Sequence, residues 1–481
     1  MNTGEVVNRR PLCVDCDGTL IQTDLLHEAA IALIKSAPLK ALAMPVWLLR
    51  GKAHLKAKIA GYVSPDVRVL PYNQQVIALV RRARSEGRET ALVTASPASY
   101  AHAIEGHLGL FDRVEATDGT TNLSGSAKAR RLVELYGERG FDYAGNARDD
   151  LPVWQAAEEA IVVDAPAGVR AVAARTARVA VMLDRPAAGA RPYLLELRPH
   201  QWLKNLLVFV PMLAAHQVTE PAALGASLLA FLAFSLCASA VYVLNDLFDL
   251  PADRQHARKR NRPLAAGTVP VLHGVLIIPL LLIASAAIAL SLPPRFWAVL
   301  LGYLAATTLY SFWLKNAVVV DVLLLAALYT SRVIAGAAAT SIPPSFWLLA
   351  LSMFLFLSLA IVKRYSEMLL TQRENKSQAA GRGYLVADLP VLLALGTASG
   401  YLAVLVLALY VNSGEVTQHY QSRGLLWLTL PLLLYWISRV WMKAHRGLMH
   451  DDPLVFAATD WQSWLSVLLA GGFATLAAYG W

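Results

Sequence analysis

The sequence predicts two fold classes in one chain, a soluble α/β domain followed by an all-α bundle of membrane-spanning helices. The first observation is composition. Of the 481 residues 56% are hydrophobic and only 16% are charged, whereas soluble domains average about 25% charged residues. The second is distribution, because long uncharged runs crowd the chain after residue 203, while residues 1–200 mix short apolar runs with polar segments. We therefore expect at least two domains.

Four short apolar segments in the first part predict the strands of a Rossmann-like α/β domain. Between the first and second of them, residues 25–68 are rich in Ala, Leu and Lys with helical periodicity. We expect this stretch to form a small helical cap, which would exclude water from a small phosphorylated substrate. The predicted strands are 11–14, 90–94, 141–145 and 160–164.

The first strand runs directly into the motif Asp-Cys-Asp-Gly-Thr, residues 15–19. A DxDGT motif after a strand resembles the haloacid dehalogenase (HAD) superfamily of hydrolases. The resemblance implies that Asp15 attacks a phosphoryl group to form an aspartyl-phosphate. Asp17 would protonate the leaving oxygen and then activate water, and Mg²⁺ would neutralise the charge.

The resemblance also implies roles for residues after the next strands. Thr94 matches the phosphate-binding hydroxyl, and Lys128 matches the lysine that holds the transferring phosphoryl group. This chain departs from the family's usual G-D-x-x-x-D motif, because Asn146 occupies the position of the first acid and Asp150 that of the second. We expect Asp15, Asp17 and Asp150 to be the metal ligands. The alternative is a regulatory or structural relic of the fold.

A segment rich in Pro, Ala and Gly predicts the domain boundary. We expect an HAD-like domain at 1–185, a linker at 186–197 and a membrane domain at 198–481. The first residues lack the apolar core of a signal peptide, so we expect the first domain to lie in the cytoplasm. The three cysteines suggest no disulfide framework. The net charge of +9 comes mainly from Lys and Arg at membrane edges, and we expect no nucleic-acid partner.

Nine apolar runs follow the linker, and each is near the length that crosses a bilayer. The loops 245–274 and 363–388 each carry five Lys or Arg, and 314–317 and 441–460 on the same side add more. Each loop on the opposite side carries at most one. Basic loops face the cytoplasm, so we expect the N-terminus inside and the C-terminus outside. The runs are 203–218, 222–244, 275–292, 296–313, 318–339, 346–362, 389–411, 425–440 and 461–479.

The stretch 245–267 carries the strongest functional signal. Asp246, Asp249 and Asp253 follow Asn245 at steps of three and four, which places them along one face of a helix. Carboxylates in such a cluster suit Mg²⁺ that carries substrate phosphates. The following arginines could hold further phosphate oxygens. The plainer alternative is a solvated helix end whose acids pair with the basic run.

Further polar residues are expected on the same side of the membrane and would outline one polar chamber with the acidic stretch. For Lys363, Arg364 and the residues of the last loop, the alternative is ordinary anchoring at the membrane interface. Arg332 lies within a predicted span, which is costly unless it faces acids or a polar cavity. The other members are Lys204, Asn205, Tyr310, Lys315, Asp321, Glu367, His450, Asp451, Asp452 and Asp460.

The motif NDxxDxxxD, the basic run and RPLAAG, set among these helices, resemble the UbiA superfamily of intramembrane prenyltransferases. That family binds a diphosphate through Mg²⁺ on two acidic motifs. The second motif departs here, because only Asp321 is present in YSFWLKNAVVVDV. This segment, with RPHQWLKN, IVKRYSE and DDPLVFAATD, is similar to the polyprenyl-phosphate phosphoribosyltransferase branch.

That branch implies phosphoribosyl diphosphate as donor and a polyprenyl phosphate lipid as acceptor. The three acids of the first motif would hold Mg²⁺, with Asn245 as an added ligand or orienter and Asp321 assisting. Arg258, Arg262 or Lys315 would stabilise the departing diphosphate. Lys204, Lys363 and Arg364 would hold the acceptor phosphate or the ribose 5-phosphate.

The fusion suggests that the HAD-like domain removes the 5-phosphate of the product, because a tether keeps the two sites at high effective concentration. Two other functions compete. One is an aromatic prenyltransferase that uses a prenyl diphosphate to modify a quinone or haem precursor. The other is a lipid-binding or transport scaffold, although transporters concentrate polar residues near the bilayer midplane.

Overall fold

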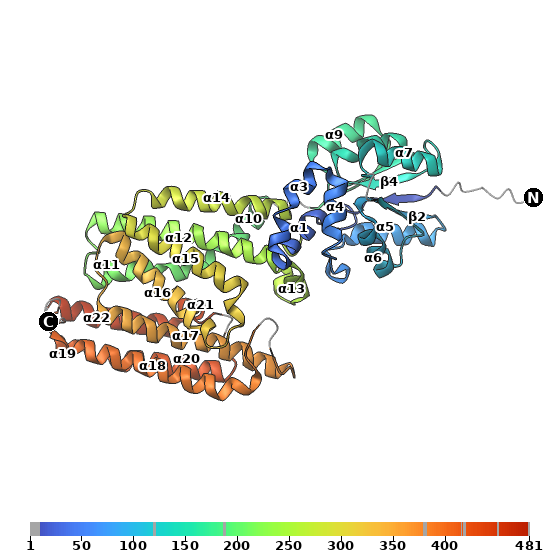
Figure 1. Cartoon of the computed structure of the whole chain (residues 1–481). Coiled ribbons are helices and arrows are strands. Elements are labelled where there is room, and N and C mark those ends of the chain that lie inside the picture. Colours follow the sequence, from blue (N-terminus) through green and yellow to red (C-terminus); the bar gives the residue numbers. More distant parts are fainter. Residues whose placement is uncertain are drawn as a thin grey trace, which may run out of the picture. The chain divides into compact units, whose positions relative to one another are not determined.

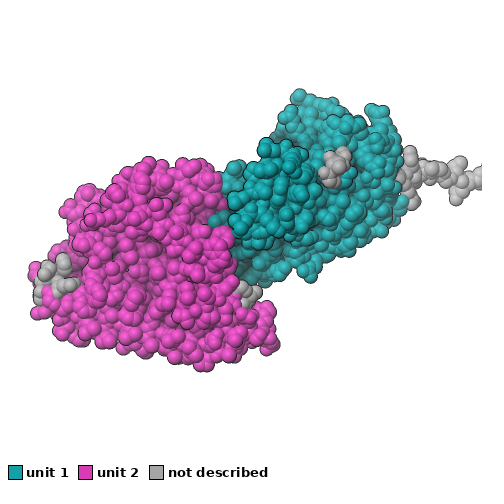
Figure 2. All heavy atoms as spheres, in the orientation of Figure 1, with its two compact units in different colours: residues 1–196, 243–277 teal, residues 197–242, 278–481 magenta. Residues whose placement is uncertain are grey.

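The computed structural model describes residues 10–118, 122–185, 189–378, 382–414, 416, 420–449 and 452–479. His450, Asp451 and part of the predicted linker lie outside these residues. The chain divides into two compact units, one made of 1–196 with 243–277 and the other of 197–242 with 278–481 (Figure 2). The acidic stretch therefore belongs to the same unit as the predicted soluble domain.

A six-stranded sheet forms the centre of the first unit, and all its neighbouring strands pair in parallel. The strand order is β3-β2-β1-β4-β5-β6. The prediction of a parallel α/β sheet is confirmed, with two more strands than the sequence suggested. The strands are β1 (Leu12–Val14), β2 (Thr90–Pro97), β3 (Arg113–Thr117), β4 (Asp142–Gly145), β5 (Glu159–Val163) and β6 (Val179–Leu183).

The central strands β1, β2, β4 and β5 are buried on both faces, which explains their nearly continuous apolar sequences. Alternate residues point to opposite faces, so Leu12 and Val14 join one core and Cys13 joins the other. Figure 1 shows α5 and α6 on one side of the sheet and α7 and α9 on the other. These helices are α5 (Gln74–Ser85), α6 (Ala98–Leu108), α7 (Gly125–Tyr136), α8 (Leu151–Ala156) and α9 (Ala167–Thr176).

A helical segment follows β1, where the cap was predicted. Asp24 caps its first helix by accepting hydrogen bonds from the Leu26 and His27 amides, and Leu33, Leu55 and other side chains join the core beneath. The segment comprises α1 (Leu25–Ser36), α2 (Pro38–Ala41), α3 (Met44–Leu49), α4 (Lys52–Ala60) and the 3₁₀ helix η1 (Val67–Val69).

The C-terminal region is helical. Its helices include η3 (Pro199–Phe209), α11 (Val210–Ala214), α12 (Pro221–Phe248), α13 (Leu250–Gln255), α14 (Val271–Ala289), α15 (Pro294–Phe312), α16 (Val320–Thr340), α17 (Phe346–Arg373), α18 (Leu389–Val411), α19 (Arg423–Leu426), α20 (Thr429–His445), α21 (Pro453–Thr459) and α22 (Trp461–Tyr479). The short elements between them are η4 (Lys259–Asn261), η5 (Leu314–Asn316) and η6 (Val386–Asp388), and α10 (Arg191–Glu196) precedes the region.

Six helical segments of the described residues are long and apolar enough to cross a membrane, so the predicted count of nine is not confirmed. The first predicted run contains Pro211, which lacks an amide hydrogen, and it folds as 3₁₀ helix η3 followed by the five residues of α11. Helices α15 and α22 carry several Ser and Thr, which lower their apolarity. The six are Pro221–Phe248, Val271–Ala289, Val320–Thr340, Phe346–Arg373, Val386–Val411 and Arg423–His445.

Candidate active sites

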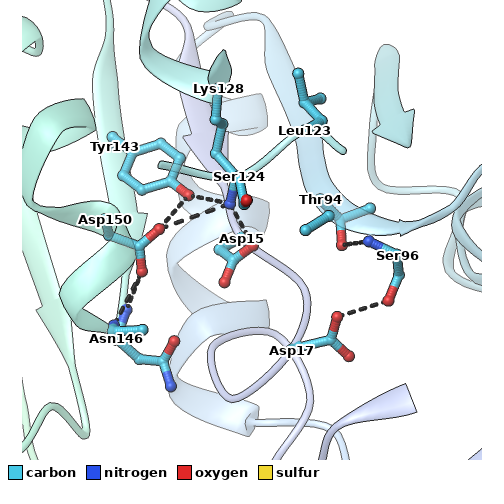
Figure 3. Close-up of polar contacts among 12 residues, drawn as sticks. Asp15, Asp17, Thr94, Ser96, Leu123, Ser124, Lys128, Tyr143, Asn146 and Asp150 are labelled. Carbon is cyan, nitrogen blue, oxygen red and sulfur yellow. Dashed lines mark hydrogen bonds and ion pairs between the residues drawn. The ribbon is translucent and has the colours of Figure 1, made fainter. Parts of the chain in front are cut away.

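Asp15 and Lys128 form the centre of the predicted phosphatase site (Figure 3). Lys128 Nζ donates a hydrogen bond of 2.8 Å to Asp15 Oδ1, and both side chains are almost fully buried. Burial raises the pKa of the Asp15 carboxyl to about 7, although the charge of Lys128 opposes this shift. Burial also disfavours the charge on Lys128, yet the attraction of Asp15 and Asp150 leaves the pKa of Lys128 raised. The lysine therefore stays cationic beside the nucleophile position.

Tyr143 links this pair to Asp150, a role that the sequence pattern did not predict. Its hydroxyl accepts from Lys128 Nζ and donates to Asp150 Oδ1, both at 2.8 Å (Figure 3). The other oxygen of Asp150 accepts the backbone amides of Asn146 and Ala147, each at 2.9 Å. Asp150 thus fixes both the lysine and the loop after β4, while its role as a metal ligand stays a prediction.

Asp17 is held from two sides. Its Oδ2 accepts from Ser96 Oγ at 2.6 Å, and its Oδ1 accepts from the Leu25 amide at the start of α1. Burial raises the pKa of Asp17 to about 6, so the group can carry a proton near neutral pH. Thr94 lies in the same corner, where its Oγ1 accepts from the Ser96 amide at 3.0 Å. The arrangement suits an acid that donates a proton and later removes one.

Asn146 bears on whether this site fits Mg²⁺. Its Oδ1 is buried and has no hydrogen-bond partner among the described residues. Its side chain also fills the space beside Gly18, where a Cβ would lie 2.1 Å from Asn146 Nδ2. Gly18 has a φ of +76°, so both its conformation and this close approach require glycine. An unused amide oxygen next to two carboxylates fits the oxygen ligands that Mg²⁺ takes.

The acidic stretch forms a second site in the same unit. Backbone hydrogen bonds from Asp249 to Asn245 and from Asp253 to Asp249 keep the i to i−4 pattern across the break between α12 and α13. Asp246 and Asp253 are both buried, and Arg262 Nη1 lies 3.0 and 2.5 Å from their carboxylates. Two carboxylates that meet at one cation offer the oxygen donors that fit Mg²⁺. Burial raises the pKa of Asp253 against the opposing charge of Arg262.

Asp249 pairs with Lys35 of α1, whose Nζ lies 3.0 Å from its Oδ1. Among the described residues, no three His, Cys, Asp or Glu side chains surround a common centre. The three predicted acids therefore form one pair and one separate ion pair. Asn245 is half-buried beside them, and Arg258 is exposed on the basic run.

Helix α1 and α13 make a further ion pair. Arg254 donates to both Glu28 oxygens, at 2.9 and 2.6 Å, and its Nε donates to the Ala265 carbonyl. Both side chains of the pair are nearly buried. A paired, two-pronged contact of this kind has a defined geometry. It connects the predicted cap to the acidic stretch, and neither partner was expected to meet the other.

In the second unit, Asp321 and Arg364 pair with each other instead of facing separate substrates. Arg364 Nε contacts Asp321 Oδ2, and both side chains have no exposed surface. The other guanidinium nitrogens of Arg364 contact Glu367 and the Tyr310 hydroxyl. Tyr384 donates to the remaining Asp321 oxygen at 2.6 Å. The Arg364 side chain has no exposed surface and its nitrogens contact protein groups, so direct phosphate contacts of Arg364 stay a prediction.

Two predicted phosphate-binding lysines do come together. Lys204 from η3 and Lys363 from α17 lie 2.5 and 3.7 Å from the same Asp452 oxygen. Burial would raise the pKa of Asp452, but the two lysines lower it to about 2. Two cations share one carboxylate, so the cluster carries an excess positive charge. Lys315 lies apart in sequence on η5, where it is half-buried.

Arg332 is satisfied inside the helices without an acid. Its Nε donates to Asn205 Oδ1 at 2.8 Å, and its guanidinium lies 5.0 Å from the centre of the Tyr303 ring. Further contacts to Phe234 and Tyr329 rings surround it. Hydrogen bonds and cation–π contacts offset the cost of a buried charge. Arg332 therefore belongs to the packing of the bundle.

Comparison with known proteins finds two families in the chain, and the UbiA match includes the acidic stretch. Residues 206–457 match the model of the UbiA prenyltransferase family, and residues 12–155 match that of haloacid dehalogenase-like hydrolases. The protein y4nM of Sinorhizobium fredii, described as uncharacterized, is 39% identical over 96% of this chain and 90% of its own length.

Two further relatives cover parts of the chain. Decaprenyl-phosphate phosphoribosyltransferase of Mycobacterium tuberculosis (strain H37Rv) is 41% identical over 37% of this chain and 60% of its own length. A solved structure of a UbiA homolog from Archaeoglobus fulgidus, bound to GPP and Mg²⁺, is 19% identical, with a TM-score of 0.46. The match covers 59% of this chain and 99% of the chain in the solved structure.

Proposed function

Because the chain belongs to the UbiA prenyltransferase family and carries an HAD-like domain, we propose that it transfers phosphoribose from phosphoribosyl diphosphate to a polyprenyl phosphate. The observation that carries the proposal is the cluster of Lys204, Lys363 and Asp452. A prenyl diphosphate and an aromatic acceptor need one anion site, whereas a phosphorylated donor and a phosphorylated acceptor need two. The likeness to decaprenyl-phosphate phosphoribosyltransferase supports the same choice.

Asp246 and Asp253 are the proposed holders of Mg²⁺, with Asp249 and Asn245 as neighbours. The ion would neutralise the diphosphate and make it a better leaving group. Arg262 lies within reach of both acids, and it would exchange these contacts for diphosphate oxygens. Two-pronged guanidinium contacts suit phosphates.

In the proposed reaction, the bond between the anomeric carbon and the diphosphate oxygen breaks, and a bond to an oxygen of the lipid phosphate forms. Diphosphate leaves with the bonding electron pair. The acceptor phosphate is already ionised, so no general base is required. Fixed negative charge near the ring favours an oxocarbenium-like transition state. Lys204 and Lys363 would hold the lipid phosphate or the ribose 5-phosphate.

The HAD-like domain is the proposed site of a second step, removal of the 5-phosphate from the lipid product. Asp15 would attack phosphorus and release the ribose hydroxyl, which takes a proton from Asp17. Water activated by Asp17 would then free phosphate from Asp15. Lys128 would balance the charge of the transferring group, and Mg²⁺ would be held near Asp15, Asp17 and Asn146. An Asp15→Asn variant should accumulate the 5-phosphorylated lipid, and equal accumulation by the unaltered protein would exclude this step.

The experiment for the transfer step measures turnover against the concentration of polyprenyl phosphate, using purified full-length protein. Lys204→Met should raise KM for the lipid phosphate by roughly 10- to 100-fold, because a charge-assisted contact is lost. Lys204→Arg should recover most of the affinity. Lys376→Met, an exposed site on the loop after α17, is the matched control. Unchanged KM in Lys204→Met, or transfer from a prenyl diphosphate to an aromatic acceptor, would contradict the proposal.

A further inference from the structure

The cap carries an apolar surface that nothing in its unit covers. Six large apolar side chains between residues 34 and 49 are exposed, and three of them are nearly bare, Leu39 at 84%, Leu42 at 75% and Leu49 at 87%. In the rest of the described residues 10–185 only four large apolar side chains are exposed, none of them above 49%, and no more than two adjoin in sequence. We call the six the cap patch, and its members are Ile34, Leu39, Leu42, Val46, Leu48 and Leu49.

The fold of the cap does not need these side chains. The opposite side of the same short helices already packs inward, through Ala41, Met44 and Trp47, which join the domain core. Trp47 also stacks on Tyr62 with a centroid distance of 6.0 Å. A soluble surface rarely leaves neighbouring apolar side chains of this size in water, unless they meet a partner.

The charge around the cap patch identifies the chemistry of that partner. Residues 29–65 contain six Lys or Arg and no Asp or Glu. Lys40, Arg50, Lys52 and Lys58 are exposed beside the patch. Apolar side chains bordered by cations are typical of segments that lie in the interfacial layer of a bilayer with anionic lipids.

The last turn of α1, which leads into the cap patch, contacts the end of α12. Lys35 Nζ donates to the Phe248 carbonyl at 2.6 Å and to Asp249 Oδ1 at 3.0 Å. Phe248 is the last residue of α12, one of the candidate membrane spans. Helix α2 begins at Pro38, three residues after Lys35. Near the other end of α1, the Glu28–Arg254 ion pair joins this helix to α13, which follows α12.

We propose that the cap patch inserts into the surface of the membrane leaflet at which α12 ends. The partner that covers the cap patch is the bilayer itself. Anionic headgroups would contact the cap cations, and acyl chains would contact Leu39, Leu42 and Leu49. This docking does not depend on the reaction proposed above, because it follows from exposure, charge and the contact of Lys35 with α12. It gives the soluble domain a second attachment to the membrane besides its linker.

The test uses the full-length protein in lipid nanodiscs. Leu42→Cys is labelled with an environment-sensitive fluorophore, and the three native cysteines are buried. Lipids with a spin label just below the headgroup should quench this fluorophore roughly twofold, and more strongly when phosphatidylglycerol is mixed into phosphatidylcholine. Val172→Cys on α9, at 42% exposure, is the matched control and should not be quenched.

Two further variants keep the test decisive. Leu39→Ser with Leu49→Ser should weaken quenching at Leu42→Cys, and their exposure means that the core is not disturbed. Quenching at Leu42→Cys equal to that at Val172→Cys would overturn the proposal. A blue shift without quenching, which grows when each nanodisc holds two copies, would also overturn it and assign the cap patch to a second copy of the chain.

Discussion

The buried pair of Asp321 and Arg364 gives the sharpest prediction for the membrane region. Arg364→Met removes the guanidinium and leaves the Asp321 carboxylate with the hydrogen bond from Tyr384. Glu367 is affected less, because it is partly exposed and keeps Arg382 at 3.6 Å. Removing one member of a buried ion pair costs about 3–5 kcal/mol. The apparent melting temperature should fall by on the order of 10 °C.

The assay is thermal unfolding of the purified protein in one detergent at one scan rate, because such unfolding is governed by kinetics as well as equilibrium. The double variant Asp321→Leu with Arg364→Met removes the stranded charge and should recover most of the loss. Arg373→Met, exposed at the end of the same helix, is the control. Two results would refute this reasoning. One is a fall in melting temperature of the single variant that corresponds to less than about 1 kcal/mol. The other is a double variant with a melting temperature as low as that of the single variant.

The remaining predictions concern the other clusters. The pKa of Asp452 is lowered to about 2, so its charge contributes about 2 kcal/mol of stability, which is fully present above pH 4 and is lost as pH falls toward 2. Asp452→Asn should therefore lower the melting temperature equally at pH 6 and pH 8. A difference between variant and unaltered protein that vanishes at pH 8 would contradict this. Tyr143→Phe removes one buried hydrogen bond from Lys128 and one from Asp150. Phosphatase turnover should therefore fall, with about 1–3 kcal/mol lost from stability, while phosphoribosyl transfer in the same preparation stays unchanged. Equal losses in both activities would point to global unfolding. Removal of Mg²⁺ with a chelator should abolish transfer, measured as label in the lipid fraction, and added Mg²⁺ should restore transfer. Transfer that persists without divalent ions would refute the metal role of the acidic stretch.

The sequence predicted four of the six strands and the centre of the candidate phosphatase site. Asp15 was expected at the end of a strand, and Lys128 was expected from the resemblance to the HAD superfamily. The two side chains are in contact, because the ends of central parallel strands bring such residues together. Tyr143 was missed, because a tyrosine in an apolar strand gives no sign of which face its hydroxyl reaches.

Pairings across long separations were beyond the sequence. Asp321 was expected to assist at the diphosphate, and Arg364 to hold the acceptor phosphate or the ribose 5-phosphate. Nothing in the local pattern shows that residues 43 positions apart will bond to each other. Lys35 on α1 was predicted only as part of a helical cap. It contacts Asp249, which lies 214 positions later in the sequence. The predicted count of nine spans is not confirmed. For the run 203–218, apolar length alone did not show that the chain folds as a 3₁₀ helix and a short α-helix.

The most direct test of the central claim follows the label of the donor. Full-length protein is given Mg²⁺, a polyprenyl phosphate and phosphoribosyl diphosphate labelled in the ribose, and the lipid fraction is extracted and counted. The account predicts labelled lipid with the unaltered protein and with Glu220→Gln, an exposed acid next to the start of α12, and none with Asp246→Asn. Absence of labelled lipid, together with turnover of a prenyl diphosphate and an aromatic acceptor, would contradict it.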